Sequence, residues 1–229
     1  MKINKLLYIG SLALALSFSL TSCDSYLDEN PDNRATLDSE EKIISLLTSA
    51  YGQSGYAVLN EVLSDNTDDM GPRYIQYDDR FFNQAFYWED ITESNNDGVI
   101  NVWQDCYNSI AVANHALQAI EELGGPKTLK LKECKAEALM SRAYYHFVLV
   151  NEFCMPYDPA TSAKDLGVPY ATEPETTLNP KYTRGNVAEV YEKIEKDILE
   201  AIPLLGDTHY TQPKYHFNKK AAYAFAARF

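Results

Sequence analysis

The sequence predicts an all-α fold that is built from pairs of helices and interrupted by one long, irregular, aromatic-rich insertion. Three observations favour this fold class. Apolar residues recur at helical spacing over long stretches, capping residues mark the starts of those stretches, and the helix pattern of residues 99–153 returns in residues 186–229. The 229 residues are enough for one large domain, or a domain and a half, with a buried core.

The first helix is expected at about residues 38–51. Asp38 followed by Glu41 resembles a capping box, in which two side chains satisfy free backbone N–H groups at a helix start. Apolar side chains then follow at the spacing of one helix face. They are Ile43, Ile44, Leu46, Leu47, Ala50 and Tyr51.

Residues 52–98 lack a helical period and collect Gly, Asn and Asp, so we expect a long loop or insertion there. Two long amphipathic helices are expected after it, at 99–123 and at about 128–153. The sequence GGP at 124–126 ends the first of them, and Pro156 closes the second.

Residues 157–183 hold four prolines, and we expect them to wander over the surface. A fourth helix should begin after Asn186, which pairs with Glu189 as a capping box, and a fifth after Asn218. The fifth helix reaches Phe229 without a glycine or another C-terminal cap, which indicates a truncated or incomplete sequence.

The last two helices repeat the pattern of the middle two. At an offset of 84 residues, Tyr107 falls on Tyr191, Ile110 on Ile194, Ala138 on Ala222 and Ala143 on Ala227. In each unit a tyrosine on the first helix precedes small residues on the second by 31 positions. This is close to the pattern of a tetratricopeptide unit, in which small residues let the second helix approach.

The first 22 residues are typical of a secretory signal peptide. Two lysines precede an uncharged apolar run, Leu6–Leu20, which is too short for a transmembrane helix. The run ends in Leu-Thr-Ser-Cys, the pattern cleaved in bacterial lipoproteins, so we predict that Cys23 becomes a lipidated N-terminus. An ordinary signal peptide with an unrelated cysteine is the alternative. The expected organisation is a signal peptide (1–22), a lipid-anchored leader (23–37) and a helical domain (38–229).

The chain is acidic, with 33 acidic and 20 basic side chains and a net charge of −13. Loss of residues 1–22 would remove two lysines and no acid, which makes the net charge of the mature chain −15. This charge argues against a nucleic-acid partner, which requires a basic surface, and favours neutral ligands. The other cysteines, Cys106, Cys134 and Cys154, lack metal-ligand spacing and are expected to be small buried residues on helices.

Four segments of the chain occur in an informative order: CDSYLDENP, VWQDCYNSIAVANHAL, AEALMSRAYYHFVLVNEFCMPY with GVPY downstream, and RGNVAEVYEKIEKDILEAIPLL. Together they resemble the SusD/RagB family of surface glycan-binding lipoproteins. The resemblance spans the mature chain but only the N-terminal half or less of a typical member. It implies a SusD-like helical scaffold with tetratricopeptide-like pairs, exposed on the outer face of the outer membrane.

The resemblance also implies a binding protein, without a cofactor, rather than an enzyme. Its ligand would be an oligosaccharide or polysaccharide, and its partner a TonB-dependent, SusC-like transporter that takes the ligand inward. The residues that match the family pattern are expected to serve packing and helix register. They are Trp103, Tyr107, Asn114, Arg142, Tyr145 and Asp197.

The ligand-binding candidates lie in the insertion. Residues 73–88 contain seven aromatics in sixteen positions, where the chain average of 12% predicts about two. Sugars present flat C–H faces and a fringe of hydroxyls, so exposed aromatics beside polar groups suit them. We expect Phe81, Phe82 and Phe86 to pack in the core. The candidate glycan contacts are Trp88, Tyr77, Tyr74, Arg73, Asp69, Asn66, Asn95 and Asn96.

Other chemistries find less support. Residues 65–69, DNTDD, resemble a calcium loop but carry Thr67 at the third position and lack the glycine at the sixth. Glycoside hydrolysis requires two carboxylates at one bond, and no pair stands out among 33 acids. The four histidines form no HExxH motif, and we expect them in the core or on the surface. The main alternative is a helical-repeat scaffold that binds only proteins and buries its insertion.

Overall fold

The computed structural model describes residues 36–53, 55–71, 80–93, 97–177 and 180–229. Within these ranges the regular elements are helices, and the single isolated bridge joins Leu166 to Asn186 in the antiparallel sense. The all-α prediction is therefore confirmed for the described residues. Leu37–Phe229 form one compact unit.

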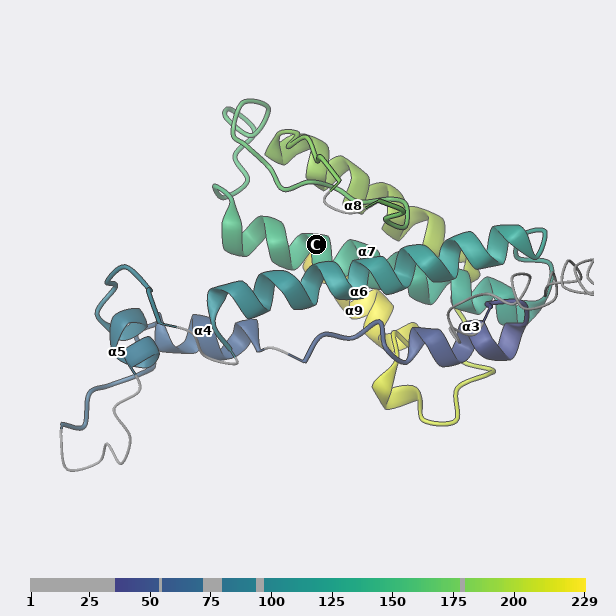
Figure 1. Ribbon diagram of the computed structural model, residues 1–229, viewed down its shortest axis with the longest axis horizontal. Helices are drawn as coiled ribbons and strands as arrows, with labels where there is room; N and C mark the ends of the chain where they lie inside the picture. Colours follow the sequence, from purple (N-terminus) through teal and green to yellow (C-terminus); the bar gives the residue numbers. More distant parts are fainter. Residues whose placement is uncertain (1–35, 54, 72–79, 94–96, 178–179) are drawn as a thin grey trace, which may run out of the picture. The chain divides into compact units, whose positions relative to one another are not determined.

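Seven α-helices are described in this unit: α3 (Glu40–Leu47), α4 (Tyr56–Val62), α5 (Arg80–Phe86), α6 (Val99–Glu122), α7 (Leu129–Phe153), α8 (Val187–Ala201) and α9 (Lys219–Arg228). The short 3-10 turns η2 (Ile202–Leu204) and η3 (Pro213–Tyr215) lie between α8 and α9. Helix α7 packs against both α6 and α8 (Figure 1). None of the helices described here has the length and apolar character needed to cross a bilayer.

The predicted caps account for the starts of the later helices. Asn186 and Glu189 form the predicted capping box, in which Asn186 Oδ1 accepts from the Glu189 backbone N–H at 2.9 Å. Glu189 Oε2 in turn accepts from the Asn186 backbone N–H at 3.3 Å. The predicted cap Asn218 accepts from the Ala221 backbone N–H at the start of α9, and Thr128, which was not singled out in the sequence, accepts from the Leu131 backbone N–H at the start of α7.

The first helix is shorter than predicted and has a different cap. Its N-cap is Ser39, whose side chain accepts from the Lys42 backbone N–H at 3.4 Å. The carboxylate of Asp38 instead lies 2.8 Å from the Lys42 ammonium. Helix α3 ends at Leu47, and its buried face packs on the C-terminal half of α6 and the N-terminal half of α7.

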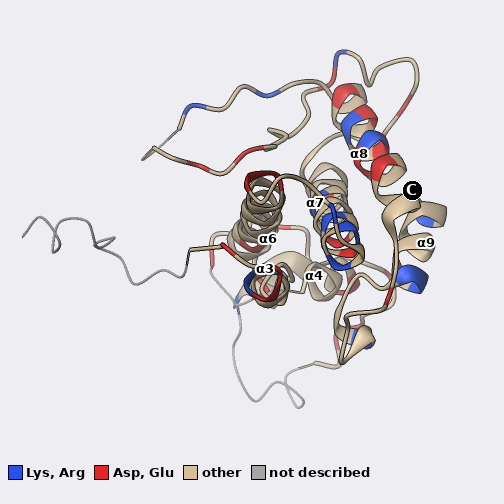
Figure 2. Cartoon of the chain, turned by 90° about the vertical axis from the view of Figure 1, so that its right-hand side faces the viewer, with Lys and Arg blue, Asp and Glu red and all other residues tan. Residues whose placement is uncertain are grey.

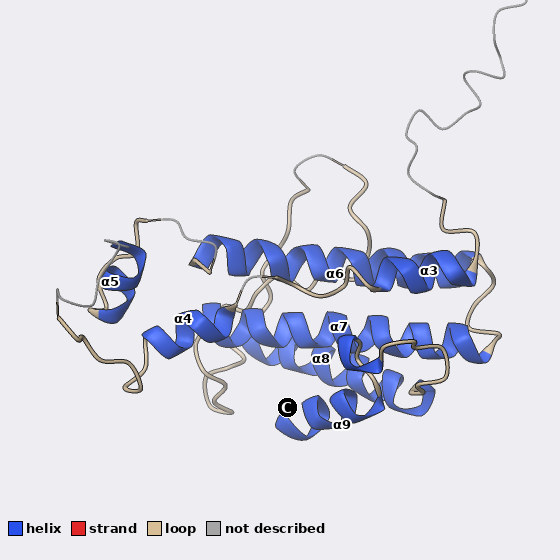
Figure 3. Ribbon diagram, turned by 90° about the horizontal axis from the view of Figure 1, so that it is seen from below, coloured by secondary structure: helices blue, strands red, loops and turns tan. Residues whose placement is uncertain are grey.

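Residues 52–98, expected to form a long loop or insertion, contain two short helices, α4 and α5. Each has seven residues, which is too short to show a helical period in the sequence. They share a small core of their own, formed by Leu59, Phe81 and Ala85. Figure 3 shows both helices at the end of the α6–α7 pair where α6 begins.

Helix α7 is the centre of the fold. Seventeen of its 25 residues are buried, so it contacts other elements on nearly every side. The buried set includes polar residues that each need hydrogen-bond partners away from water. Arg142 donates hydrogen bonds to Asn114 of α6 and pairs with Asp197 of α8, which agrees with its predicted role in helix packing. Burial lowers the pKa of Arg142, but the bonds to Asp197 outweigh burial and raise it overall.

Residues 157–183 form no helix or strand in their described part, as predicted, but they do not simply wander over the surface. The GVPY sequence at 167–170 holds them to the core. Val168 is 1% exposed, and Tyr107 OH donates to the carbonyl of Pro169 at 2.9 Å. Tyr170 stacks on His146 with ring centroids 3.7 Å apart. This connection therefore stabilises the contact between α6, α7 and α8.

A second polar cluster holds the segment between α8 and α9 to α7. The Glu133 carboxylate lies 2.7 Å from His209 Nδ1, and the Glu137 carboxylate lies 2.7 Å from His216 Nδ1. Tyr51 OH donates to Glu137 and accepts from the Phe217 backbone N–H. Three of the four histidines thus have structural positions in the interior, as expected, and His115 is exposed.

The predicted repeat is visible in burial. Tyr107 and Tyr191 are both half-buried, Ile110 and Ile194 are both buried, and Ala138 and Ala222 are both fully buried. The fourth pair differs, because Ala143 is fully buried and Ala227 is exposed. Of the cysteines, Cys106 and Cys134 are buried on α6 and α7 as predicted, and Cys154 is half-buried after α7.

Candidate functional site

The insertion folds as a small unit that we call the α4–α5 unit, comprising residues 55–71 and 80–93. Helix α4 fixes it to the long helices through two side-chain contacts. The hydroxyls of Tyr56 and Tyr144 lie 2.8 Å apart, and Asn60 Nδ2 donates to Glu152 Oε1 at 2.9 Å. The unit therefore presents its remaining surface at the end of the α6–α7 pair.

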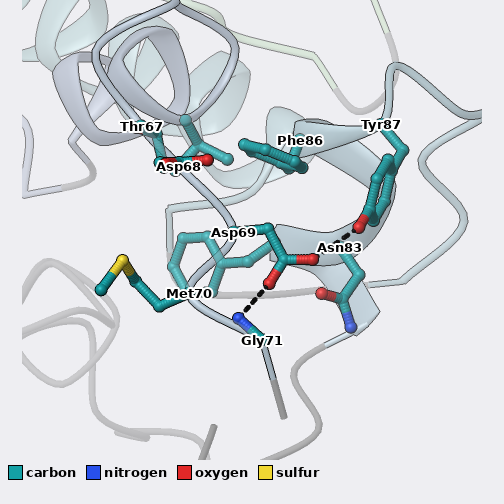
Figure 4. Close-up of a pocket in the computed structure, with 10 residues that line it drawn as sticks. Thr67, Asp68, Asp69, Met70, Gly71, Asn83, Phe86 and Tyr87 are labelled. Atoms are coloured by element: carbon teal, nitrogen blue, oxygen red, sulfur yellow. Dashed lines mark hydrogen bonds between the residues drawn. The ribbon is translucent and has the colours of Figure 1, made fainter. Parts of the chain in front are cut away.

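A hollow of about 270 Å³ opens between α5 and the loop that follows α4 (Figure 4). Helix α5 contributes one face, because residues 82, 83, 86 and 87 are neighbours on a helix surface. These residues are Phe82, Asn83, Phe86 and Tyr87. Val62 and residues 67–71 form the opposite side. The hollow thus combines aromatic rings with an amide and carboxylates, which is the composition expected of a sugar site.

Asp69 is the best-fixed polar group of this hollow. Its Oδ1 accepts from the Gly71 backbone N–H at 2.7 Å, and its Oδ2 accepts from Tyr87 OH at 2.8 Å (Figure 4). The turn requires a φ of +76° at Gly71, which glycine adopts without strain. The Gly71 N–H and the Tyr87 hydroxyl lower the pKa of Asp69, while the bond to Asp69 raises the pKa of Tyr87. Asp69 therefore stays ionised, and Tyr87 keeps its proton.

The Tyr87 ring is held in place yet open to solvent. Its hydroxyl is bound to Asp69, and its ring meets Phe86 edge-to-face at 5.0 Å between centroids. It remains 57% exposed, and Met70 across the hollow is 65% exposed. A ring that is ordered without a ligand loses little conformational entropy when a ligand binds.

Trp88 occupies a position that usually holds glycine. Its backbone N–H donates to Ala85 O at 3.1 Å, and the Glu89 N–H donates to Gln84 O at 2.8 Å. This pair of bonds is the Schellman pattern that ends a helix, with Trp88 in the left-handed conformation at φ 55°. The left-handed region costs a non-glycine residue about 1–2 kcal/mol. The indole is nevertheless 75% exposed, so packing does not account for it.

The Gln84 side chain fixes the chain after Trp88. Its Oε1 accepts from the backbone N–H groups of Thr92 and Glu93 at 3.0 and 3.2 Å, and its Nε2 donates to Thr92 Oγ1 at 2.9 Å. Hydrogen bonds therefore fix the backbone at Trp88 and Glu89 and again at Thr92 and Glu93. The indole of Trp88 projects from a fixed backbone.

The structure brings together only part of the predicted site. Asp69 lines the hollow, and Trp88 directly follows Tyr87 without lining it. Asn66 is exposed in the turn after α4 and does not line the hollow. Six predicted site residues lie outside the described residues: Cys23, Arg73, Tyr74, Tyr77, Asn95 and Asn96.

Several lining residues were not among the sequence candidates. Phe82 and Phe86 were expected in the core, but only Phe81 is fully buried, whereas these two are half-buried and line the hollow. Asn83 and Tyr87 were not singled out. The spacing 82, 83, 86, 87 would have indicated a shared face had a helix been predicted at 80–86.

A larger hollow, of about 470 Å³, lies between α6 and residues 172–176. Its lining includes Asn114, Leu117 and Pro174 but no aromatic side chain. It thus lacks a surface on which a sugar ring could stack, and the α4–α5 hollow is the better candidate. Within the described ranges, no three His, Cys, Asp or Glu side chains are grouped so that they could hold a metal ion.

Comparison with known proteins agrees with the fold. The SusD-like family model, described as starch-binding and associating with the outer membrane, matches residues 25–229. A SusD superfamily protein from Bacteroides thetaiotaomicron is 27% identical, with a TM-score of 0.64 over 85% of this chain and 42% of that protein. No match was found among curated proteins.

Two further proteins of known structure share the fold. A putative sugar binding protein from Bacteroides vulgatus is 24% identical, with a TM-score of 0.62 over 82% of this chain and 41% of its own. A laminarin binding SusD-like protein is 21% identical, with a TM-score of 0.56 over 81% of this chain and 38% of its own. The chain thus spans less than half the length of these proteins.

Proposed function

The chain belongs to the SusD-like family of carbohydrate-binding proteins, and on this premise we propose that it captures oligosaccharides at the cell surface for uptake. A TonB-dependent, SusC-like transporter would receive the bound glycan and pass it inward. The family is associated with the outer membrane, which agrees with a role in uptake. The role is one of binding, in which the glycan leaves the site chemically unchanged.

The observation that carries the proposal is the pair of exposed aromatics at the end of α5, beside an ionised carboxylate. Tyr87 and Trp88 are 57% and 75% exposed. Sugar C–H faces stack on such rings, and the free lone pairs of Asp69 can accept sugar hydroxyl protons. At about 270 Å³ the hollow is near the lower end of ligand pockets, so one sugar unit would enter it. The rest of a chain would lie across the neighbouring rings.

The exposure of these rings also bears on the alternative, a scaffold that binds only proteins. That hypothesis expects a buried insertion, with its aromatics packed against the helices. Phe81 meets this expectation, being fully buried. Trp88 does not, because it is exposed and has a left-handed backbone conformation that is unfavourable for a tryptophan. The exposed rings favour a ligand with flat apolar faces.

We further propose that residues 1–22 are removed and that Cys23 carries the lipid that anchors the protein to the outer membrane. A leader at 23–37 would then connect the anchor to the helical domain. Anchoring next to a transporter keeps the site at high effective concentration near the pore, so a modest affinity is enough. Labelled palmitate should enter the expressed protein and should not enter the Cys23→Ser variant. Equal labelling of both would contradict lipidation at Cys23.

Glycan binding is tested by retention of the protein on immobilised polysaccharides. We expect the wild-type chain to be retarded on at least one matrix and Trp88→Ala to lose most of that retardation. Tyr215→Ala is the matched control, because Tyr215 is 77% exposed but lies in η3, outside the α4–α5 unit. Equal loss in both variants, or none in Trp88→Ala, would remove Trp88 from the site.

A further inference from the structure

The charge around the candidate site is uneven. The described residues of the α4–α5 unit, 55–71 and 80–93, carry seven acidic side chains and one arginine, which gives a net charge of −6 in 31 residues. Arg80 is the one basic residue in the described α4–α5 unit, and its guanidinium lies 3.5 Å from the Glu93 carboxylate. Figure 2 shows lysines and arginines on α7, α8 and α9, with others on α3 and on the connecting loops. The described α4–α5 unit therefore has an acidic surface, and its one described cation is already paired.

Two of these acidic side chains, Asp68 and Asp69, line the hollow, and two more, Glu89 and Asp90, directly follow Trp88 in the chain. All four are exposed, so they face solvent from which a ligand would arrive. Asp69 accepts from Gly71 and Tyr87 and still has lone pairs for about two further donors. A ligand that donates hydroxyl protons suits this surface.

A ligand that carries its own negative charge meets repulsion here. Two like charges 4 Å apart in water weaken binding by about five-fold, and the effect grows as water is displaced. Several carboxylates act together, since the screening length is about 10 Å at 0.1 M salt. Arranging like charges against an unwanted ligand is a common source of specificity.

We infer that this site takes uncharged glycans and discriminates against chains that bear carboxylate or sulfate groups. This ligand class rests on the proposed function of the site and adds to it a basis for selectivity. Asp68, Glu89 and Asp90 would be the specificity-determining residues, and Tyr87 and Trp88 would supply the affinity common to both kinds of glycan.

The test uses matched ligands that differ only at C6, where a neutral hydroxymethyl group is replaced by a carboxylate. Neutral α-1,4- and β-1,3-linked glucan oligosaccharides are compared with the same compounds oxidised at C6 to the uronate, by calorimetry at 0.01 M and 0.3 M salt. We expect the uronate form to bind at least five-fold more weakly than the neutral form at low salt. The ratio of the two affinities should become smaller at high salt. Binding of the neutral form should change less than two-fold with salt.

A double variant tests the residues. Glu89→Gln with Asp90→Asn should narrow the ratio of neutral to uronate affinity at low salt by at least two-fold, with both forms measured on the same variant. Glu192→Gln with Glu195→Gln, two exposed acids on α8, is the matched control and should leave this ratio unchanged. Equal or tighter binding of the uronate form by the wild type would overturn the inferred discrimination against charged glycans but not the proposed function. Failure of every neutral and oxidised glucan to bind would overturn the proposed function as well.

Discussion

Arg142 and Asp197 form a buried, two-pronged ion pair, with Nε to Oδ2 and Nη2 to Oδ1 both at 2.7 Å. Asn114 of α6 accepts from the same guanidinium at 3.1 Å, and Tyr170 OH donates to the same carboxylate at 2.6 Å. One ion pair therefore joins three helices and the long connection before α8. Its bidentate geometry fixes the relative register of α7 and α8.

Removal of Asp197 should destabilise the fold strongly. Asp197→Ala leaves the buried Arg142 cation without its partner, and we expect a loss of about 3–5 kcal/mol in the free energy of unfolding. Urea unfolding followed by circular dichroism measures it. The control is Asp38→Ala, which removes an exposed ion pair with Lys42 and should cost less than about 1 kcal/mol. Similar losses in both variants would show that the buried pair does not hold the helices together.

His146 should make stability depend on pH. Burial lowers its pKa to about 3, so the folded protein keeps it neutral, with Nδ1 2.8 Å from the Arg142 carbonyl. Unfolded histidine binds a proton near pH 6.5. The unfolded state then holds more protons below that pH, so stability falls as pH drops from about 6.5 towards 3. The slope reaches about 1.4 kcal/mol per pH unit.

The measurement is the free energy of unfolding between pH 6.5 and 5. This window lies above the range in which Glu133 contributes. Burial raises the pKa of Glu133, but the bonds from His209 and Thr208 outweigh burial and lower it overall. The contribution of Glu133 to the free energy of unfolding is therefore lost only at more acidic pH. We expect His146→Gln to lower the slope of the free energy of unfolding against pH by the amount that one bound proton contributes. Substitution of the exposed His115 by Gln should leave this slope unchanged. An unchanged slope in His146→Gln would refute the assignment.

Gly167 should not tolerate a side chain. A Cβ placed there would lie 2.7 Å from the Asn186 carbonyl oxygen and 2.8 Å from Val190 Cγ2, both at the start of α8. We expect Gly167→Ala to cost about 1–3 kcal/mol, because the connection would have to move away from α8. Gly52→Ala is the control, since its Cβ would meet its nearest neighbours at an ordinary 3.4 Å. Equal stability of the two variants would contradict close packing at Gly167.

Trp88 should separate stability from binding. Trp88→Gly relieves the left-handed backbone strain, and we expect it to stabilise the protein by about 1 kcal/mol while it weakens retention on glycan matrices. Trp88→Ala should weaken retention without that gain. Urea unfolding and affinity electrophoresis give the two quantities. A glycine variant that is both less stable and still retained would mean that the indole serves the fold.

The sequence predicted the helices that have strong local signals. Residues 99–122 and 129–153 are long and amphipathic, and Asn186 and Asn218 are capping residues that act locally. The position of residues 157–183 could not be predicted in this way, because it depends on distant contacts. The bond from Tyr107 to Pro169 spans 62 residues, and no local pattern announces it.

The candidate site was predicted less completely than the fold. Composition drew attention to the aromatics of 73–88, and Asp69 does lie in the hollow. The partnership of Asp69 with Tyr87 depends on how the loop after α4 folds back on α5, eighteen residues later. The faces of α5 also decide which phenylalanine is buried, and a seven-residue helix gives too little pattern to assign them.

The central claim, that a glycan stacks on Trp88, is tested most directly by tryptophan fluorescence. The chain has two tryptophans, and Trp103 packs on Tyr107 and Phe153 and does not line the hollow, so Trp103→Phe leaves Trp88 as the sole reporter. Titration of this variant with a neutral oligosaccharide that the protein retains should give a saturable change in emission, with the same affinity as calorimetry. Saturable binding by calorimetry with no change in Trp88 emission would contradict the claim.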